Sequence, residues 1–351
     1  MARSSPQLIF FTELDAAGQQ ALLARPEVID RLTAHGDGIA LAIHELSPTQ
    51  AAVVRLLNAR SVPLTAWLLL TREAGYWINV DNYPQAIARF HAFREWADAE
   101  RLTFAAVGLD MQPSSPQRQR LHTANPFEVY DAVVAARNNA LFPAAYEAYH
   151  DLIAEIRSDG YVAHTYQYPF VVDDRRAGTT LVQRALNVVA LPVELEVLMC
   201  YSSLVPRWLG GSSLGSALIA EYGVYADAIG IGTTGGGTHG APQVGEPAER
   251  LSWTEFTRDL RVAARYTDTI HVFSLEGCVE NDYVARLEHF DWHAPVVIPT
   301  RFRVLARLLR LTSMSILGWS RVGLAFMGWL GWVVVAVIMV RRLLRRLRRQ
   351  G

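Results

Sequence analysis

Lysine is absent from the chain, and all 33 basic residues among its 351 residues are arginine. Without lysine the protein cannot be a Schiff-base aldolase, hold pyridoxal phosphate on a lysine or use a P-loop lysine. Cysteine is nearly absent as well: Cys200 and Cys278 are too few for a disulfide framework or a four-cysteine zinc site. We expect neither a metal nor another cofactor.

Acidic residues are missing from one part of the chain. Residues 301–351 contain 11 arginines and no acidic residue, whereas residues 1–300 contain 22 arginines and all 34 acidic residues. The formal net charge of −1 therefore divides into −12 for the main segment and +11 for the C-terminal segment. An acidic main segment argues against a nucleic-acid-binding protein, because such a surface needs clustered positive charge.

Charged residues are also missing from residues 322–340, a run of 19 residues. A helix of this length comes close to the thickness of the hydrocarbon core of a bilayer, about 30 Å. The run therefore predicts a single transmembrane helix. The alternative is a buried helix of the soluble core, although such helices rarely run this long without a polar face.

Basic residues flank this uncharged run on both sides. Residues 302–321 are predicted to form an amphipathic helix at the membrane surface, with Arg303, Arg307 and Arg310 on one side and a leucine-rich opposite side. An ordinary solvated helix is the alternative. The tail 341–351 has six arginines, so both flanks favour the cytoplasm, the tail slightly more. The N-terminus does not resemble a signal peptide, so we expect the main domain to face the cytoplasm.

Residues 1–293 repeat one pattern, a short apolar run followed by helix signals. Ser47 before Pro48 and the capping-box spacing from Ser252 to Glu255 mark two of the helix starts. Eight near-continuously apolar runs suit strands that are buried on both faces, as in an α/β fold of the (β/α)₈ (TIM) barrel type. An open doubly wound sheet is the alternative, and residues 294–301 are predicted to link the barrel to the membrane segment. The runs are Leu8–Phe11, Ile39–Ile43, Leu64–Leu70, Phe104–Leu109, Tyr161–Tyr166, Leu195–Cys200, Ala228–Gly232 and Thr269–Leu275.

The ends of these runs carry the candidate chemistry, because barrel active sites lie at the carboxyl ends of the strands. Carboxylates, amides and aromatic rings gather there without a basic cluster, which is typical of a carbohydrate site. The alternative for each carboxylate is a structural role as a helix cap or arginine partner. The candidate catalytic residues are Asp110, Glu276 and Glu45, and the candidate substrate-binding residues are Tyr201, Gln112, Tyr166, Gln167, His44, Trp77 and Glu13.

Two other kinds of site are weaker candidates. A metal-dependent amidohydrolase would place two histidines at the first strand end, where this chain has Phe11-Thr12-Glu13. His44, His164 and His271 each stand alone, which is typical of core residues. The glycine run Gly235–Gly237 could offer backbone N–H groups to a phosphate, but glycine runs also form tight turns.

The fourth and sixth runs resemble the chitinase-like (family 18) barrel glycoside hydrolases. Phe104–Pro113 reads FAAVGLDMQP, where that family ends its fourth strand in an aspartate-x-glutamate pair, and Met199-Cys200-Tyr201 matches its Met-x-Tyr on the sixth. The resemblance implies that Asp110 and Tyr201 contact the sugar. The family's general acid falls on Gln112, however, and an amide cannot donate a proton as a carboxylic acid does.

These observations lead to three hypotheses. The first is a membrane-anchored glycosidase that acts on a polysaccharide or glycolipid, with Asp110 stabilising developing charge and Glu276 or Glu45 transferring the proton. The second, motivated by Gln112, is a barrel that binds glycans without cutting them, as a scaffold of an envelope polysaccharide system. The third is an enzyme acting on a phosphorylated sugar or lipid headgroup at the glycine run.

Overall fold

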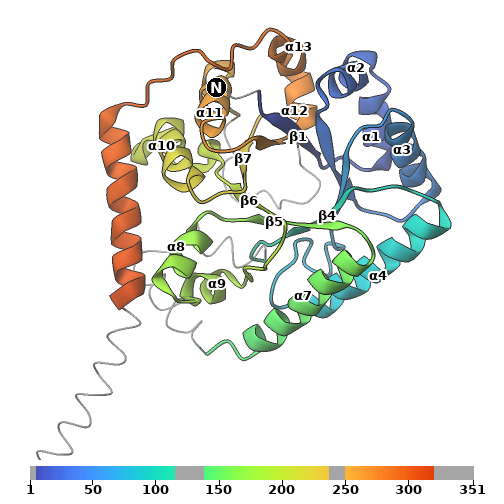
Figure 1. Cartoon of the computed structure of the whole chain (residues 1–351), viewed down its shortest axis with the longest axis horizontal. Coiled ribbons are helices and arrows are strands. Elements are labelled where there is room, and N and C mark those ends of the chain that lie inside the picture. Colours follow the sequence, from blue (N-terminus) through green and yellow to red (C-terminus); the bar gives the residue numbers. More distant parts are fainter. Residues whose placement is uncertain (1–4, 115–137, 237–249, 320–351) are drawn as a thin grey trace, which may run out of the picture.

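Eight parallel strands form a closed barrel in the computed structural model, which describes residues 5–114, 138–236 and 250–319. Each strand pairs with its sequence neighbours, and β8 closes the barrel by pairing with β1. Figure 1 looks along the barrel, with the strands inside and the helices around them. The predicted (β/α)₈ fold is confirmed. The strands are β1 Gln7–Thr12, β2 Gly38–Ile43, β3 Leu64–Leu68, β4 Ala106–Asp110, β5 Val162–Gln167, β6 Leu195–Met199, β7 Ala228–Gly232 and β8 Thr269–Phe273.

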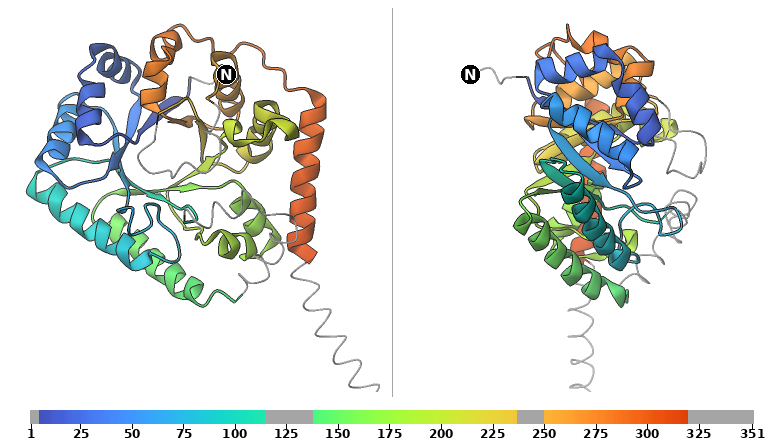
Figure 2. Two further views of the ribbon diagram at one scale, coloured as in Figure 1. Left: turned by 180° about the vertical axis from the view of Figure 1, so that it is seen from behind. Right: turned by 90° about the vertical axis from the view of Figure 1, so that its right-hand side faces the viewer.

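Helices cover the outside of the barrel, as both views in Figure 2 show. The predicted caps at Ser47 and Ser252 are confirmed: the Ser47 hydroxyl accepts from the backbone of Gln50, and Ser252 forms a capping box with Glu255. The helices are α1 Ala16–Leu23, α2 Pro26–His35, α3 Pro48–Ala59, α4 Tyr83–Ala99, α7 Leu141–Ser158, α8 Phe170–Ala177, α9 Leu181–Leu186, α10 Gly211–Gly223, α11 Trp253–Ala263, α12 Leu275–Glu280 and α13 Tyr283–Leu287, with the 3₁₀ turns η1 Ser202–Leu204 and η2 Arg207–Leu209.

The interior of the barrel is a packed core and not a channel. Alternate residues of each strand point inward. Phe11 lies among the rings of Trp67, Tyr166 and Phe273, with centroid distances of 5.1, 4.8 and 6.0 Å. Gly108 leaves the room that Tyr166 needs, because a Cβ at Gly108 would lie 2.5 Å from the tyrosine hydroxyl. The packed rings form a floor beneath the carboxyl ends of the strands.

The end of the eighth strand differs from the prediction. The strand stops at Phe273, and Leu275 already belongs to α12. The hydroxyl of Ser274 caps this helix by accepting from the backbone N–H of Gly277 at 3.3 Å. Glu276 therefore lies in the first helical turn and not at the tip of a strand.

A further helix, residues 300–319, crosses the outside of the barrel beside α8 and α10 and is the orange-red helix at the left of Figure 1. Arg310 was expected to face the membrane surface together with Arg303 and Arg307, but it is buried against the barrel, whereas the other two are exposed. Its Nε donates to Asp173 Oδ1 at 2.8 Å, and its guanidinium lies 4.3 Å from the ring centre of Tyr225. A carboxylate is stable in the interior only with a cation or several hydrogen-bond donors beside it. Arg310 supplies this cation to Asp173, and this explains why its side chain faces the barrel.

No helix within residues 5–114, 138–236 and 250–319 is long and apolar enough to cross a membrane. The transmembrane helix predicted over 322–340 and the arginine tail 341–351 lie outside the described residues.

Candidate functional site

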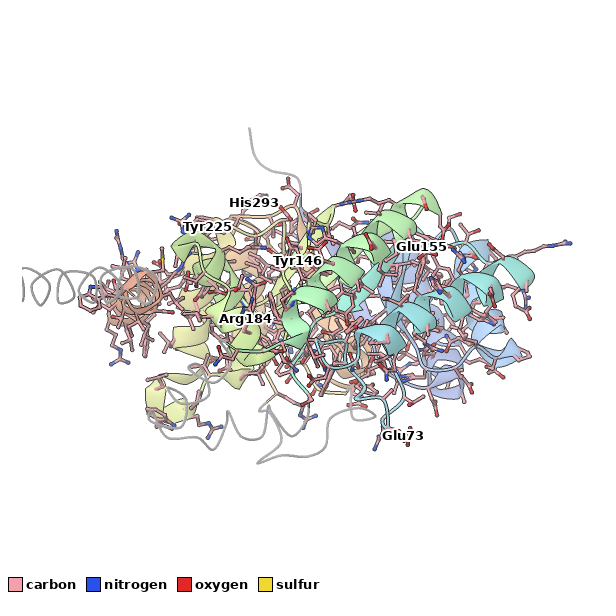
Figure 3. All side chains as sticks on the ribbon, turned by 90° about the horizontal axis from the view of Figure 1, so that it is seen from below. Glu73, Tyr146, Glu155, Arg184, Tyr225 and His293 are labelled. Atoms are coloured by element: carbon pink, nitrogen blue, oxygen red, sulfur yellow. The ribbon has the colours of Figure 1, made fainter. Side chains whose placement is uncertain are left out.

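The two ends of the barrel can be followed in Figure 3. Glu73, in the loop after β3, lies at one end, and His293 lies at the other. The carboxyl ends of the strands and the predicted site residues belong to the end that carries Glu73. We call this end the rim.

Asp110 and Gln112 form the centre of the rim on the β4 side. The backbone there is held from both sides, because Ile78 donates to the carbonyl of Asp110 at 3.0 Å and Met111 donates to the carbonyl of Tyr166 at 3.1 Å. Asp110 is only 2% exposed. Gln112 Nε2 lies 2.8 and 3.0 Å from the two carboxylate oxygens of Asp110. The Gln112 amide therefore donates to the carboxylate of Asp110.

Tyr168 extends this pair along the rim. Its hydroxyl donates to Gln112 Oε1 at 3.3 Å, so the amide is engaged at both its oxygen and its nitrogen. The ring of Tyr168 stacks on Phe170, with an interplanar angle of 12° and a centroid distance of 6.1 Å. Phe170 is 47% exposed, so an aromatic face is open to solvent beside the amide.

A second carboxylate group lies where β1 and β8 meet. The hydroxyl of Tyr76 donates to Glu13 Oε1 at 2.7 Å, and the backbone N–H of Glu13 donates to Glu276 Oε1 at 3.2 Å. The His44 ring donates from Nε2 to the carbonyl of Glu13 at 2.9 Å. Burial raises the pKa of the Glu276 carboxyl, more than its hydrogen bonds lower it. Among the described residues, Glu276 Oε2 is buried without a hydrogen-bond partner.

The two groups belong to one site. The pKa of Tyr201 is raised well above its usual value, first by burial and then by the charges of Asp110 and Glu13, among other groups. The pKa of Tyr76 is raised by burial, by Glu13 and then by Asp110. Both phenols therefore lie within electrostatic reach of both carboxylates.

Four of the predicted residues lie away from this cluster or beneath it. Glu45 is exposed and accepts from the hydroxyl of Ser47 at 3.0 Å. Gln167 points away from the barrel interior, and its Nε2 donates to the carbonyl of Val189 at 2.6 Å. Tyr166 and Trp77 are buried in the aromatic floor, so neither ring face is open to a ligand here.

Tyr76 and Tyr168 were not among the predicted site residues, although both contact them. The position of Tyr168 could have been found from strand alternation, since it is two residues beyond the inward-facing Tyr166. Tyr76 gives no such signal. Its backbone is in the left-handed region, with φ 66°, in a loop that turns the ring back over the barrel.

The histidines inside the barrel are uncharged. Burial lowers the pKa of His271 to about 3 and that of His164 to about 4. Neither ring nitrogen of His271 has a hydrogen-bond partner among the described residues. No group of three histidine, cysteine or carboxylate side chains that could hold a metal ion is found in the described part of the chain.

The backbone at the start of the glycine run accepts hydrogen bonds from side chains near the eighth strand. Asn281 Nδ2 donates to the carbonyl of Thr234 at 2.9 Å, and the Ser274 hydroxyl donates to the carbonyl of Gly235 at 2.7 Å. Gly236, with φ 75°, lies so close over Glu276 that a Cβ would clash with it. Gly237 lies outside the described residues, so the phosphate-loop hypothesis gains no support from this segment.

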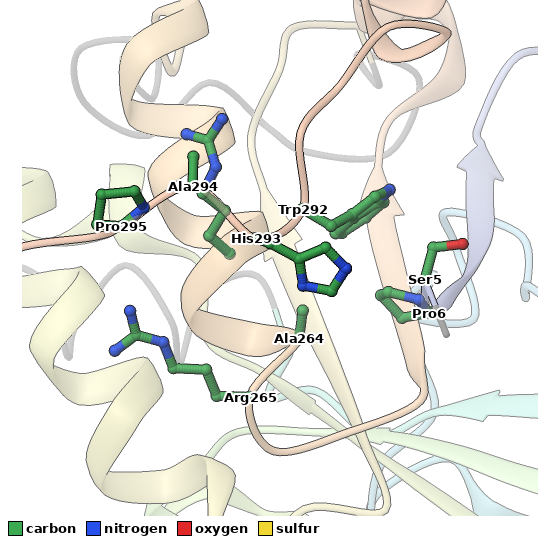
Figure 4. A pocket seen from close by; sticks show the side chains of 9 residues that line it. Ser5, Pro6, Ala264, Arg265, Trp292, His293, Ala294 and Pro295 are labelled. Atoms are coloured by element: carbon green, nitrogen blue, oxygen red, sulfur yellow. The ribbon is translucent and has the colours of Figure 1, made fainter. Parts of the chain in front are cut away.

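Pockets beside the barrel include two that are lined by described residues. One of about 550 Å³ lies next to the rim, between the segments that follow β6 and β7, and is lined by Ser203, Arg207, Arg250 and Glu255 among others. The other, of about 280 Å³, is shown in Figure 4 and involves Ser5, Pro6, Arg265 and His293. It belongs to the end opposite the rim, away from the carboxylates.

No model of a known protein family matches the chain, and no curated protein matches it. Among solved structures, a GH18 chitinase from Pseudoalteromonas aurantia is similar, with 9% sequence identity and a TM-score of 0.47, over 80% of this chain and 98% of that chain. The barrel predicted from the eight apolar runs is present as a closed ring of eight parallel strands. The chain is thus a (β/α)₈ barrel.

Proposed function

We propose that the barrel binds a carbohydrate at its rim, with Asp110 and Gln112 as the central polar contacts. The observation that carries the proposal is the double contact of Gln112 Nε2 with both oxygens of Asp110, at 2.8 and 3.0 Å. A carboxylate and an amide held side by side offer acceptors and a donor to neighbouring sugar hydroxyls. The ligand would be an oligosaccharide or polysaccharide, or the glycan headgroup of a glycolipid.

Aromatic side chains supply the rest of such a site. The stacked pair of Tyr168 and Phe170 has an exposed ring beside Gln112, and the apolar face of a sugar ring packs on such surfaces. Tyr201 is partly exposed and lies within electrostatic reach of Asp110, so its hydroxyl is a further contact.

Binding without cleavage is favoured by the identity of residue 112. A general acid must carry a proton that it can release, and the Gln112 amide has none. Its Nε2 moreover already donates one hydrogen bond to Asp110. The rim therefore supports recognition of a sugar better than protonation of a glycosidic oxygen at this position.

Hydrolysis is the second candidate function, and Glu276 is the observation that favours it. A carboxyl with a raised pKa and an oxygen without a partner is suited to hold a proton for transfer. Glu276 is 4% exposed and lies beneath Gly236, so transfer to a substrate would require the backbone at Gly236 to move away.

The proposal can be tested by titrating the full-length chain with a panel of neutral and acidic oligosaccharides. Oligomers of β-1,4-linked N-acetylglucosamine come first, because Asp110-Met111-Gln112 and Met199-Cys200-Tyr201 resemble the family 18 motifs. Calorimetry would measure affinity, and mass spectrometry of the same mixtures would detect cleavage products.

Two variants show whether binding depends on the carboxylate of Asp110. Asp110→Asn should weaken binding roughly 10- to 100-fold, the effect of losing a hydrogen bond to a charged group. Glu45→Gln, at an exposed carboxylate that follows β2, is the matched control and should bind as wild type. Binding of no glycan, or equal affinity for all three proteins, would refute the proposal. Product that disappears in Glu276→Gln would establish hydrolysis instead.

A further inference from the structure

The helix formed by residues 300–319 packs one face against the barrel, and its opposite face is apolar and is not covered by any described part of the chain. The face against the barrel includes Ala306, Arg310 and Leu317, which are buried. The opposite face follows the helical spacing 304, 308, 311 and 319. Its residues Val304, Leu308, Leu311 and Trp319 are 51%, 55%, 53% and 79% exposed. We call these four residues the outer stripe.

The helix that carries the outer stripe is fixed firmly to the barrel. Arg310 fixes the helix to the barrel through Asp173, and Arg310 Nη1 also donates to the carbonyl of Glu221. Figures 1 and 2 show the helix lying along the side of the barrel over its whole length. The stripe is therefore presented on a rigid support. Large exposed apolar patches on such supports mark interaction sites.

The charged residues beside the outer stripe indicate the chemistry of the surface that it contacts. Arg303 and Arg307 are four residues apart and lie along one edge of the stripe, and both are exposed. Residues 301–351 contain no acidic residue that could neutralise them. An apolar stripe edged by arginine, with tryptophan at its end, is the composition of a helix that lies in the interface of an anionic bilayer.

The sequence that follows the helix agrees with this partner. Residues 322–340, which begin three positions after Trp319, contain no charged residue, and six arginines follow them. A protein partner would not require such a run. A lipid bilayer accounts for both the outer stripe and the uncharged run, because lipid tails accept apolar side chains and anionic headgroups attract arginine.

We propose that the outer stripe rests on an anionic lipid surface and so holds the barrel with the side formed by α8 and α10 towards the membrane. In this arrangement the arginines at the edge of the stripe contact lipid phosphates. The inference is independent of the carbohydrate site, which lies at the end of the barrel and not on its side.

The test uses the full-length chain, whose own cysteines, Cys200 and Cys278, are buried. Leu308→Cys places an environment-sensitive fluorophore on the stripe. Ala52→Cys, at an exposed position of α3 across the barrel, is the matched control. Each labelled protein is mixed with vesicles of phosphatidylcholine alone or of phosphatidylcholine and phosphatidylglycerol in equal parts.

We expect the label at position 308 to shift to the blue and to be quenched by nitroxide-bearing lipid on the anionic vesicles, while the label at position 52 is unchanged. Arg303→Gln and Arg307→Gln should each weaken partitioning about fivefold, the contribution of one arginine near an anionic surface. These variants leave the outer stripe and the helix–barrel contacts unaltered.

Three outcomes would overturn the proposal. In the first, the protein does not bind either kind of vesicle. In the second, it binds but the label at position 308 stays open to aqueous iodide, which would mean that the chain is held elsewhere. In the third, the label is already protected without vesicles and light scattering shows a dimer, which would make a second copy of the chain the partner of the stripe.

Discussion

Replacing Gln112 by glutamate tests the centre of the rim most directly. The substitution puts a carboxyl oxygen where Nε2 lies, 2.8 and 3.0 Å from the two oxygens of Asp110. Two unit charges about 3 Å apart repel by about 5 kcal/mol at an effective dielectric constant of about 20, which corresponds to about 4 pKa units. The pair should therefore keep one proton near neutral pH, as in carboxylate dyads.

The retained proton has a measurable consequence for stability. A carboxyl whose pKa is higher in the folded than in the unfolded state stabilises the protein fully below its unfolded pKa, and this contribution is lost as pH rises through the folded pKa. Relative to wild type, the free energy of unfolding of Gln112→Glu should fall by up to about 5 kcal/mol between about pH 4 and about pH 8. Urea denaturation followed by near-ultraviolet circular dichroism measures the difference.

The double variant Asp110→Asn/Gln112→Glu is the control, because it exchanges the amide and the carboxylate and leaves one negative charge. Its pH dependence should return to that of wild type. If Gln112→Glu alone already behaves as wild type from acid to neutral pH, the two side chains are not held together and the argument for the rim fails. If Gln112→Glu cleaves N-acetylglucosamine oligomers and wild type does not, the new carboxyl lies close enough to the bound sugar to protonate the glycosidic oxygen.

Three further variants test other parts of the structure by urea denaturation. Glu276→Gln removes a carboxyl whose pKa is raised by burial. The variant should therefore not show the loss of stability that wild type shows as pH rises above about 4.5, and an unchanged pH profile would contradict this burial. His271→Phe removes a ring whose pKa is lowered to about 3, and wild type, but not the variant, should lose up to about 1.4 kcal/mol per pH unit as pH falls below about 6.5. Arg310→Met leaves Asp173 buried without its cation and should cost about 3–5 kcal/mol; if the added change Asp173→Asn restores nothing, the ion pair is not the cause.

The barrel could be predicted because its strands are buried on both faces. All six residues of Gly38–Ile43 are buried, and such a run is apolar throughout, so it stands out from the helices around it. The position of Glu276 could not be found in this way, since Thr269–Leu275 is apolar on both sides of the point where the strand ends. Only the Ser274 hydroxyl, which caps the next helix, separates the two elements.

The side of the C-terminal helix that meets the barrel shows a second limit of the sequence. Helical spacing places Arg303, Arg307 and Arg310 close to one another around the axis, and a charged residue is expected to face solvent. Asp173, 137 residues earlier in the chain, reverses that expectation for one of them. A periodic pattern contains no information on a partner so distant in sequence, and the buried carboxylate is not visible as such before the fold is known.

The two carboxylates of the site differ in a way that decides between recognition and catalysis. Asp110 is reached from solvent through the partly exposed Gln112, whereas Glu276 lies beneath the backbone of Gly236. A sugar at the rim would meet the amide and its aspartate first, and neither can supply a proton while Asp110 is ionised. Glu276 could supply one only after the backbone at Gly236 moves away from it. Binding therefore needs nothing beyond the observed arrangement, and hydrolysis needs one conformational step more.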